Sequence, residues 1–258
     1  MRGAGVSGSA SALASPASGA ALIGSLSVFF PCYNDAPTIG GLVRSTTDTL
    51  AAAGIAHEII VVNDGSSDDS LAVLEDLARE IGVLTIVDHG VNRGYGAALR
   101  SGFAAANGEW VFYTDGDGQY DPTEVESLIA LVSDEVDVVQ GWKLGRNDSA
   151  LRALVGRAYH HAVRLLFRLP VGDTDCDFRL IRRAALERVT LRHSSGVICV
   201  EMLRKLDQSG ARFTEIGVHH YARPFGRSQF FRFGRVARSL LDVALLWVNL
   251  VLLRRRDG

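Results

Sequence analysis

Two aspartates separated by one glycine are the strongest candidates for metal ligands in this sequence. Asp115 and Asp117 lie in the stretch Tyr-Thr-Asp-Gly-Asp-Gly-Gln, directly after a short apolar run. Carboxylates at this spacing can meet one divalent ion, and Mg²⁺ is usually held by one or two carboxylates together with substrate phosphates. Such an ion stabilises a diphosphate as a leaving group. Asp-Gly pairs are also common in plain turns, so the position of this pair in the fold decides its meaning.

Three further polar clusters accompany this pair, at residues 31–35, 64–69 and 92–96. Asp64 can accept hydrogen bonds from a nucleobase or a ribose, or belong to an ordinary turn that caps a helix. Arg93 and Gly94 lie in a glycine-rich loop that leads into a predicted helix, and helix N-termini favour anions. The full dinucleotide fingerprint and a Walker lysine are absent from the sequence, which argues against NAD-binding and P-loop proteins.

Short apolar runs precede all four clusters and predict the strands that position them. These runs are rich in Val, Ile and Phe with little polar alternation, which is typical of parallel strands buried on both faces. We expect strands at 26–31, 58–63, 84–88, 110–114 and 136–140, with helices at 38–53, 69–81, 95–107 and 122–133. Four strand–helix repeats predict an α/β fold with a doubly wound, mostly parallel central sheet, and ligands bind outside the carboxyl ends of such strands.

The second half of the sequence has a less regular pattern. We expect a helix at 150–168, an extended piece at 174–181, helices at 182–189 and 197–209, and a strand at 212–218. A strongly apolar helical segment is predicted from 230 to 253.

Taken together in order and spacing, the four clusters resemble glycosyltransferase family 2, whose members have the GT-A fold. Within that family the sequence is most similar to the polyprenyl-phosphate sugar synthases. The resemblance implies that a nucleoside-diphosphate sugar binds to Pro31, Tyr33, Asp35, Asp64, Arg93, Gly94 and Asp115. It also implies that Asp115, Asp117 and Gln119 surround Mg²⁺ or Mn²⁺ and the diphosphate. Asp35 stands where the family usually has a longer glutamate.

Two later segments resemble the acceptor side of the same family. Asp177 precedes Phe-Arg, as in some relatives, and is our candidate for a base or an acceptor-orienting residue; a solvated turn or an ion pair with Arg179 is the alternative. Gln229 stands where the family has lysine. The acceptor phosphate is assigned to Arg179, Arg223, Arg227 and Ser228. Asp117, Asp177 and Arg223 are the candidate catalytic residues.

Composition suggests one large domain and a reducing compartment. The chain has 258 residues, of which 47% are hydrophobic, and three widely spaced cysteines without a CxxC pair. Free thiols fit a cytoplasmic protein. We expect residues 1–24, rich in Ala, Ser and Gly, to be a disordered extension, and residues 25–229 to form the GT-A domain.

The sequence pattern of residues 230–258 predicts an amphipathic helix beside a basic patch. Its apolar run is too short and too polar to span a membrane. A peripheral place on the inner face of the membrane fits this pattern, and packing on the sheet or on a second subunit is the alternative. The Arg–Phe stretch before it carries no recognised nucleic-acid-binding motif, so we expect no nucleic-acid partner. A homo-oligomer is left open.

These observations predict an inverting, metal-dependent glycosyltransferase. The expected donor is a nucleoside-diphosphate sugar, GDP-mannose or a UDP-hexose, and the expected acceptor is a polyprenyl phosphate at the cytoplasmic membrane face. Two alternatives stay open from the sequence. One is a family 2 glycosyltransferase with a soluble or protein-linked acceptor, and the other is a non-catalytic module that binds nucleotide sugars.

Overall fold

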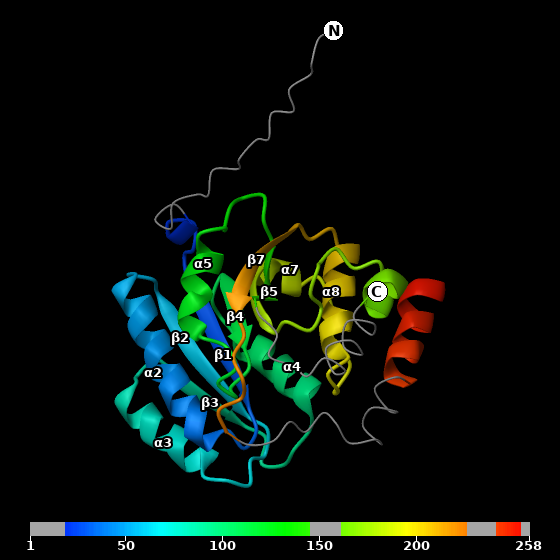
Figure 1. Ribbon diagram of the computed structural model, residues 1–258. Coiled ribbons are helices and arrows are strands. Elements are labelled where there is room, and N and C mark those ends of the chain that lie inside the picture. The colour runs from blue at the N-terminus through cyan, green and yellow to red at the C-terminus, as the bar shows by residue number, and fades with distance from the viewer. Residues whose placement is uncertain (1–18, 145–160, 226–240, 254–258) are drawn as a thin grey trace.

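A seven-stranded sheet forms the centre of the molecule (Figure 1), which a computed structural model describes for residues 19–144, 161–225 and 241–253. The first half alternates strands and helices as expected. The elements of this half are β1 (Leu26–Cys32), α2 (Ala36–Ala52), β2 (His57–Asn63), α3 (Ser70–Glu80), β3 (Leu84–Asp88), α4 (Tyr95–Ala105) and β4 (Trp110–Thr114).

The second half adds three strands and several short helices to this framework. The elements are the 3₁₀ turn η1 (Pro122–Glu124), α5 (Val125–Ile129), β5 (Val138–Leu144), β6 (Phe178–Arg182), α7 (Arg183–Leu186), α8 (Ile198–Gln208) and β7 (Phe213–His219). The strand order is β3-β2-β1-β4-β6-β5-β7. Only β6 runs antiparallel to its neighbours, β4 and β5, so the sheet is mostly parallel as predicted.

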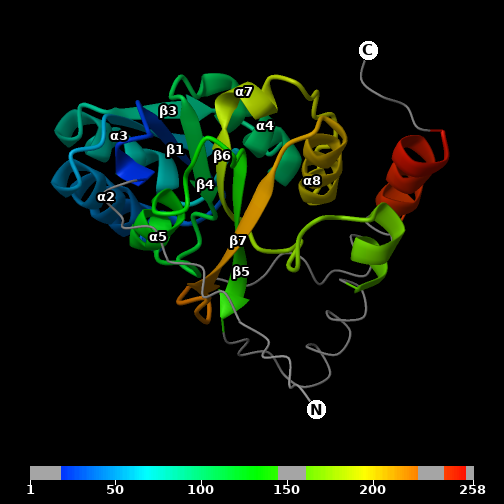
Figure 2. The ribbon, with the colours of Figure 1, turned by 90° about the horizontal axis from the view of Figure 1, so that it is seen from above.

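Helices cover both faces of the sheet, as Figure 2 shows from above. Alternate residues of one strand serve the two faces: Phe30 of β1 packs with α2, α3 and α5, whereas Phe29 packs with α4, α7 and α8. Every residue of β1 and β4 is buried. Burial on both faces explains why these strands lack polar alternation in the sequence.

Two expectations about element bounds need correction. The helix expected at 122–133 is a 3₁₀ turn followed by α5, which ends at Ile129. The backbone then tightens, because Leu131 and Val132 donate to carbonyls three residues earlier, and such bonds close a helix end. Residues 19–24, assigned to the extension, include Ile23, which is only 6% exposed in the core.

A third apolar cluster joins two helical segments to the outer side of α8. Residues 161–167 are helical, and so are residues 241–252, whose last turn is the π-helix η2 (Val248–Leu252). The rest of the helices expected at 150–168 and 230–253 lies outside the described residues. Within residues 19–144, 161–225 and 241–253, no helix has the length and apolar character needed to cross a membrane.

Candidate active site

The polar clusters that follow β1, β2 and β4 meet at one edge of the sheet. Backbone bonds fix this meeting: Asp64 N donates to Cys32 O, and Gly116 N donates to Pro31 O. Asn34 adds a side-chain tie, because its Oδ1 accepts from the backbone nitrogens of Ser67 (2.7 Å) and Asp68 (3.3 Å). The prediction of one composite site at the carboxyl ends of the strands is therefore matched by the geometry.

Asp115 and Asp117 lie at the end of β4 in a strongly anionic environment. The pKa of Asp115 is raised well above its usual value, first by burial and then by the carboxylates of Asp177 and Asp117. Burial also raises the pKa of Asp117, while its ion pair with Arg223 opposes that rise. Asp115 Oδ1 accepts a hydrogen bond of 2.8 Å from the hydroxyl of Tyr95.

This donor set fits a divalent cation. Burial and neighbouring charges raise the pKa values of both carboxyl groups, so the protein itself compensates their negative charge only in part, and hard cations prefer such oxygen ligands. Asp115 and Asp117 would hold the ion together with oxygens of a bound diphosphate. In the described part of the chain no group of three or more His, Cys, Asp or Glu side chains is arranged to hold a metal without such help.

Gln119 has a different place from the one expected. Its side-chain nitrogen lies 3.2 Å from Tyr221 O and 3.4 Å from His220 Nε2, so the amide is directed at the segment after β7. Its backbone nitrogen donates to Asp117 Oδ1 at 3.0 Å. Gln119 thus holds the shape of the acidic loop, and Asp115 and Asp117 remain the candidate metal ligands.

A cavity of about 320 Å³ opens beside the acidic pair. Among its lining residues are Asn34, Asp35, Thr38, Asp68, Asp117 and Phe225. Burial raises the pKa of Asp35 to about 6, against the lowering effect of the hydrogen bond from Tyr33 N. Of the residues expected at the nucleoside, Asp35 lines the cavity, while Tyr33 beside it is 37% exposed and Pro31 lies at the buried end of β1.

The carboxylate of Asp64 accepts hydrogen bonds from three other groups of the protein. It is 3% exposed, and Oδ1 accepts from His89 Nδ1 (2.7 Å) and Arg93 N (2.8 Å) while Oδ2 accepts from Gly94 N (2.9 Å). His89 Nε2 in turn lies 2.8 Å from Ser101 Oγ on α4. Asp64 therefore fixes the glycine-rich loop, in which Gly94 has φ +94°, a conformation that favours glycine.

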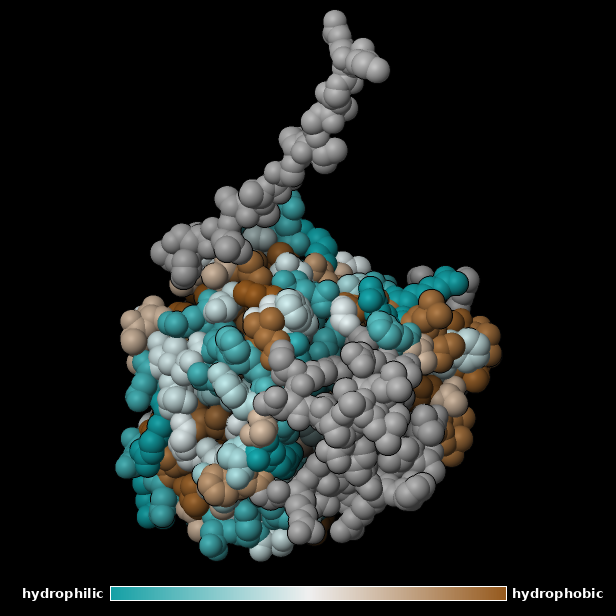
Figure 3. Space-filling model, viewed as in Figure 1, coloured by the Kyte–Doolittle hydropathy of each residue, from teal (hydrophilic) through white to brown (hydrophobic). Residues whose placement is uncertain are grey.

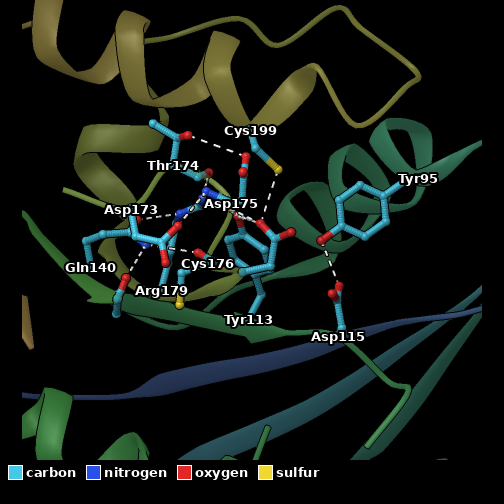
Figure 4. A network of polar contacts seen from close by, with 12 residues as sticks. Tyr95, Tyr113, Asp115, Gln140, Asp173, Thr174, Asp175, Cys176, Arg179 and Cys199 are labelled. Carbon is cyan, nitrogen blue, oxygen red and sulfur yellow. Dashed lines mark hydrogen bonds and ion pairs between the residues drawn. The ribbon is translucent and has the colours of Figure 1, made fainter. Parts of the chain in front are cut away.

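Asp177 accepts hydrogen bonds from a buried polar network around Arg179, Tyr113 and Cys199, three residues that Figure 4 labels. Its Oδ1 accepts from Arg179 Nη1 at 2.7 Å, from Cys199 Sγ at 3.1 Å and from Tyr113 OH at 3.4 Å. The Asp177 side chain keeps 16% exposure, whereas that of Arg179 has none. Burial and the charge of Asp177 raise the pKa of the Cys199 thiol, so Cys199 stays protonated.

The structure does not place Arg179 where an acceptor phosphate could reach it. Its guanidinium donates to Gln140 Oε1, Asp177 and Thr174 O, and all of it is buried. The expected contact between Arg179 and a phosphate is therefore replaced by an ion pair with Asp177. A buried guanidinium without such partners would be costly, which explains the density of bonds around it.

Arg223 lies at the acidic pair, and its expected contact with a phosphate stays a prediction. It follows β7 and pairs with Asp117 across 106 residues of sequence, with 29% of its side chain exposed. Arg227 and Ser228, the other two residues assigned to the acceptor phosphate, lie outside the described residues.

Lys143 and Tyr95 belong to the site although sequence reasoning missed them. The charge of Lys143, at the end of β5, lowers the pKa of both Asp115 and Asp117, and its Nζ donates to Asp175 O at 2.6 Å. The available signal was that Lys143 is one of only two lysines in the sequence, although it lies beyond the strand expected at 136–140. Tyr95 had no such signal, since aromatic residues at a helix start are common.

Comparison with known proteins places most of the chain in one family. Residues 27–190 match the family described as "Glycosyl transferase family 2". The undecaprenyl-phosphate 4-deoxy-4-formamido-L-arabinose transferase of Salmonella paratyphi B is 30% identical over 228 residues, or 87% of this chain and 68% of that protein. The enzyme of the same name from Salmonella typhimurium shows the same identity and coverage.

Solved structures share the fold at lower identity. Glucosyl-3-phosphoglycerate synthase from Mycobacterium tuberculosis, in complex with Mn²⁺ and UDP-glucose, superposes with a TM-score of 0.70 at 21% identity, over 90% of this chain and 83% of that chain. Its complex with Mn²⁺, UDP and phosphoglyceric acid gives 0.69 at 20% identity, over 90% and 81%. The predicted GT-A fold is confirmed, and with the family match over most of its length this chain belongs to glycosyl transferase family 2.

Proposed function

We propose that this protein transfers a sugar from a nucleoside-diphosphate sugar to a polyprenyl phosphate at the cytoplasmic face of a membrane. One observation carries the proposal: the buried acidic pair at the end of β4 lies beside a cavity of about 320 Å³ and an arginine from the far end of the chain. A divalent cation on this acidic pair would bind the diphosphate of a donor, and the adjoining cavity would take another part of the same molecule.

Residues at the carboxyl edge of the sheet support binding of a nucleoside-diphosphate sugar as the donor. Asp35 and Asp68 line the cavity and offer acceptors for nucleoside N–H and O–H groups. Asp64 holds the backbone of Arg93 and Gly94 at the same edge of the sheet. A divalent ion on Asp115 and Asp117 would neutralise the diphosphate as it leaves. Mn²⁺ and UDP-glucose in the Mycobacterium tuberculosis synthase support this reading through the shared fold.

The choice of a polyprenyl phosphate as the acceptor rests on the names of the relatives and on the position of Asp177. The Salmonella enzymes are named for transfer to undecaprenyl phosphate. In the proposed step an oxygen of the lipid phosphate bonds to the anomeric carbon with inversion, and the bond from that carbon to the donor diphosphate breaks. The electron pair leaves with the nucleoside diphosphate. Because the lipid phosphate is already an anion, the step needs no base, so Asp177 orients the acceptor.

Arg223 and Lys143 are described cations that act on the acidic pair. Arg223 pairs with Asp117, and Lys143 acts electrostatically on both members of the acidic pair. Two anionic substrates at an acidic site require such positive charge. We assign Arg223 to the phosphates, as the sequence suggests, and add Lys143 on the strength of its position.

Membrane association is supported by an exposed apolar surface rather than by a membrane span. Leu241, Leu245 and Leu252 of the C-terminal helix are 52–59% exposed, and Leu165 on the adjacent helical segment is 79% exposed. This apolar surface shows brown at the right edge of Figure 3. An amphipathic helix of this kind lies in the interface of a bilayer. The three free cysteines agree with a reducing, cytoplasmic location.

The decisive experiment is a transfer assay with a panel of UDP- and GDP-sugars, undecaprenyl phosphate and Mn²⁺ or Mg²⁺. We expect wild-type protein to form a glycosylated lipid. Asp117→Asn should lower the rate at least 100-fold with a melting temperature close to wild type. Asp121→Asn is the matched control, since Asp121 is an N-cap in the same loop and asparagine caps equally well.

Three outcomes would contradict parts of the proposal. Full activity of Asp117→Asn, or full activity in excess chelator, would exclude the metal role. Transfer only to soluble acceptors, such as phosphoglyceric acid, would exclude the lipid acceptor. Binding of every donor without transfer to any acceptor would leave a nucleotide-sugar binding module.

A further inference from the structure

The segment 191–196, between α7 and α8, lies directly against the glycine-rich loop at the start of α4. Gly96 N donates to Ser194 O at 2.9 Å. A Cβ on Gly96 would lie 2.4 Å from His193 O, and one on Gly94 would lie 2.5 Å from Ser194 O. Real Cβ atoms do not approach backbone oxygens so closely. The two backbones are therefore in contact with no spare space, and a shift of one must move the other.

Two helices hold the first half of the 191–196 segment in place. Glu201 of α8, 1% exposed, accepts from the backbone nitrogens of Arg192 and His193 and from His193 Nδ1 at 2.9–3.1 Å. From α4, Arg100 donates to Arg192 O at 2.8 Å. These bonds fix the segment up to His193.

The second half of the segment is held by α4 and α8 and, in addition, by the C-terminal helix. Arg100 Nη2 of α4 donates to Ser194 Oγ at 3.4 Å, and Ile198 N and Cys199 N of α8 donate to Ser195 O and Gly196 O. Ser195 Oγ donates to Asp242 Oδ2 at 3.0 Å. Asp242 stands in the first turn of the described helix 241–252, where the neighbouring side chains are mostly apolar. The same helix packs its inner residues Val243, Leu246 and Leu250 into the third apolar cluster. Asp242 is thus a polar contact from this helix to the segment that supports the glycine-rich loop.

The glycine-rich loop also contacts the acidic pair, through Tyr95. Tyr95 lies between Gly94 and Gly96 and donates to Asp115 Oδ1 at 2.8 Å, as the right side of Figure 4 shows. A chain of direct contacts therefore runs from Asp242 through Ser195 and Ser194 to Gly96, and from Tyr95 to Asp115. Each link is a hydrogen bond or a covalent neighbour.

We propose that Ser195 and Asp242 are positioning residues for the donor site. Their hydrogen bond holds the 191–196 segment against Gly94 and Gly96 and so holds Tyr95 on Asp115. The inference deepens the proposed function, on which its kinetic part rests. Neither residue touches substrate in this account; both act through the backbone of the glycine-rich loop. This proposal gives a role to Asp242, a charged residue in a mostly apolar helix.

The first test is amide hydrogen exchange of the protein without ligands, read at Gly96. Ser195→Ala and Asp242→Ala should each speed exchange of the Gly96 amide about tenfold, since its acceptor, Ser194 O, loses support. Asp242→Asn keeps an acceptor oxygen and should restore the wild-type rate. Ser45→Ala, which removes a hydroxyl bonded only within α2, is the control and should change nothing at Gly96.

The second test is functional. In Ser195→Ala and Asp242→Ala we expect weaker Mn²⁺ binding, by about threefold in an EPR titration of the free ion. We also expect a KM for the donor that rises by a similar factor, with kcat changed less. Asp242→Asn should behave as wild type in both assays.

The outcomes separate this inference from the proposed function. Unchanged exchange at Gly96 in both alanine variants would overturn the inference even if the enzyme is active. Faster exchange that Asp242→Asn fails to restore would overturn the role of the hydrogen bond. If wild-type protein transfers no sugar, the proposed function fails, and the exchange experiment still decides whether the contact exists. Ser195→Ala removes one hydroxyl from a partly exposed loop, so the test survives if Asp242→Ala does not fold.

Discussion

Individual carboxylates in this protein differ in role because their partners differ. Asp115 and Asp117 carry raised pKa values, from burial and neighbouring charges, and suit a cation. Asp64, which is 3% exposed, is more buried than either of them but has three donors on its two oxygens, so it fixes the backbone of the glycine-rich loop. All three residues are aspartates followed by glycine. The surroundings of each carboxylate decide what it does.

His89 provides a direct test of the structural role of Asp64. Replacing it in His89→Phe leaves a carboxylate that is 3% exposed without one of its three donors. A hydrogen bond to a charged group contributes roughly 1.5–3 kcal/mol, so we expect the free energy of unfolding to fall by about 2 kcal/mol. Urea denaturation at pH 7 measures this loss.

Ser101→Ala is the matched comparison for His89→Phe. It removes only the outer bond to His89 Nε2 and should cost less than about 1 kcal/mol. Donor KM should rise in His89→Phe, because the loop at Arg93 and Gly94 loosens. Equal unfolding curves for His89→Phe and wild type would show that Asp64 does not need this donor.

Among the elements, α8 holds the 191–196 segment, which contacts the glycine-rich loop beside the site. Its Glu201 accepts from His193 and from the backbone of Arg192, and it forms an ion pair of 3.1 Å with Lys205. These bonds lower the pKa of Glu201 to about 2 despite its burial, with the His193 hydrogen bond as the largest lowering effect. The ordinary value is 4.5, so the folded state favours the ionised form.

Glu201→Gln should therefore reduce stability in a pH-dependent way. The folded pKa is depressed, so the stabilisation is present above pH 4.5 and is lost as the pH falls toward 2. At 1.36 kcal/mol per pKa unit the shift corresponds to about 3 kcal/mol at neutral pH. Urea melts at pH 7 and pH 4 should show a larger difference between Glu201→Gln and wild type at pH 7.

The control for this prediction is Glu187→Gln. Glu187 pairs with Arg183 on the surface with 59% side-chain exposure, and such pairs contribute less than about 1 kcal/mol. A loss in Glu201→Gln that is the same at both pH values would contradict the electrostatic account and leave only packing as its cause.

On the scale of the whole molecule, the apolar surface lies away from the sheet. Figure 2 shows the C-terminal helix beyond α8, on the side opposite α2 and α3. Its inner residues Val243, Leu246 and Leu250 are 2–7% exposed, while Leu241 and Leu245 are above 50%. A contiguous apolar surface of this kind marks an interaction site with a membrane or a protein.

Vesicle binding tests which partner the surface takes. Wild-type protein should sediment with vesicles that contain anionic lipid, and Leu241→Ser combined with Leu245→Ser should weaken that binding at least tenfold, because apolar area drives insertion into the interface. Val243→Ser is unsuitable as a control because it is buried; Leu22→Ser, 43% exposed at the other end of the sheet, is suitable. Concentration-dependent dimers of wild type without vesicle binding would assign the surface to a second copy.

The sequence alone determined the order of the elements and the edge at which the site lies. Runs rich in Val, Ile and Phe predicted β1 to β4 nearly to the residue, and the burial of β1, β4 and most of β2 on both faces explains the pattern of those three strands. Once those strands are parallel, their carboxyl ends must share an edge, so Asp64, Asp115 and Asp117 had to lie at the same edge of the sheet. This inference needs only local chemistry and the geometry of a parallel sheet.

Tertiary structure alone decided which side chains complete the site and which ones support it. Arg179 and Arg223 look alike in sequence, yet one is buried under Asp177 and the other reaches Asp117 from 106 residues away. Lys143, Tyr95 and Ser195 gain their roles only through contacts with distant parts of the chain. Local patterns report burial and turns, whereas partners separated by many residues are set by how the whole chain packs, and no local pattern encodes that.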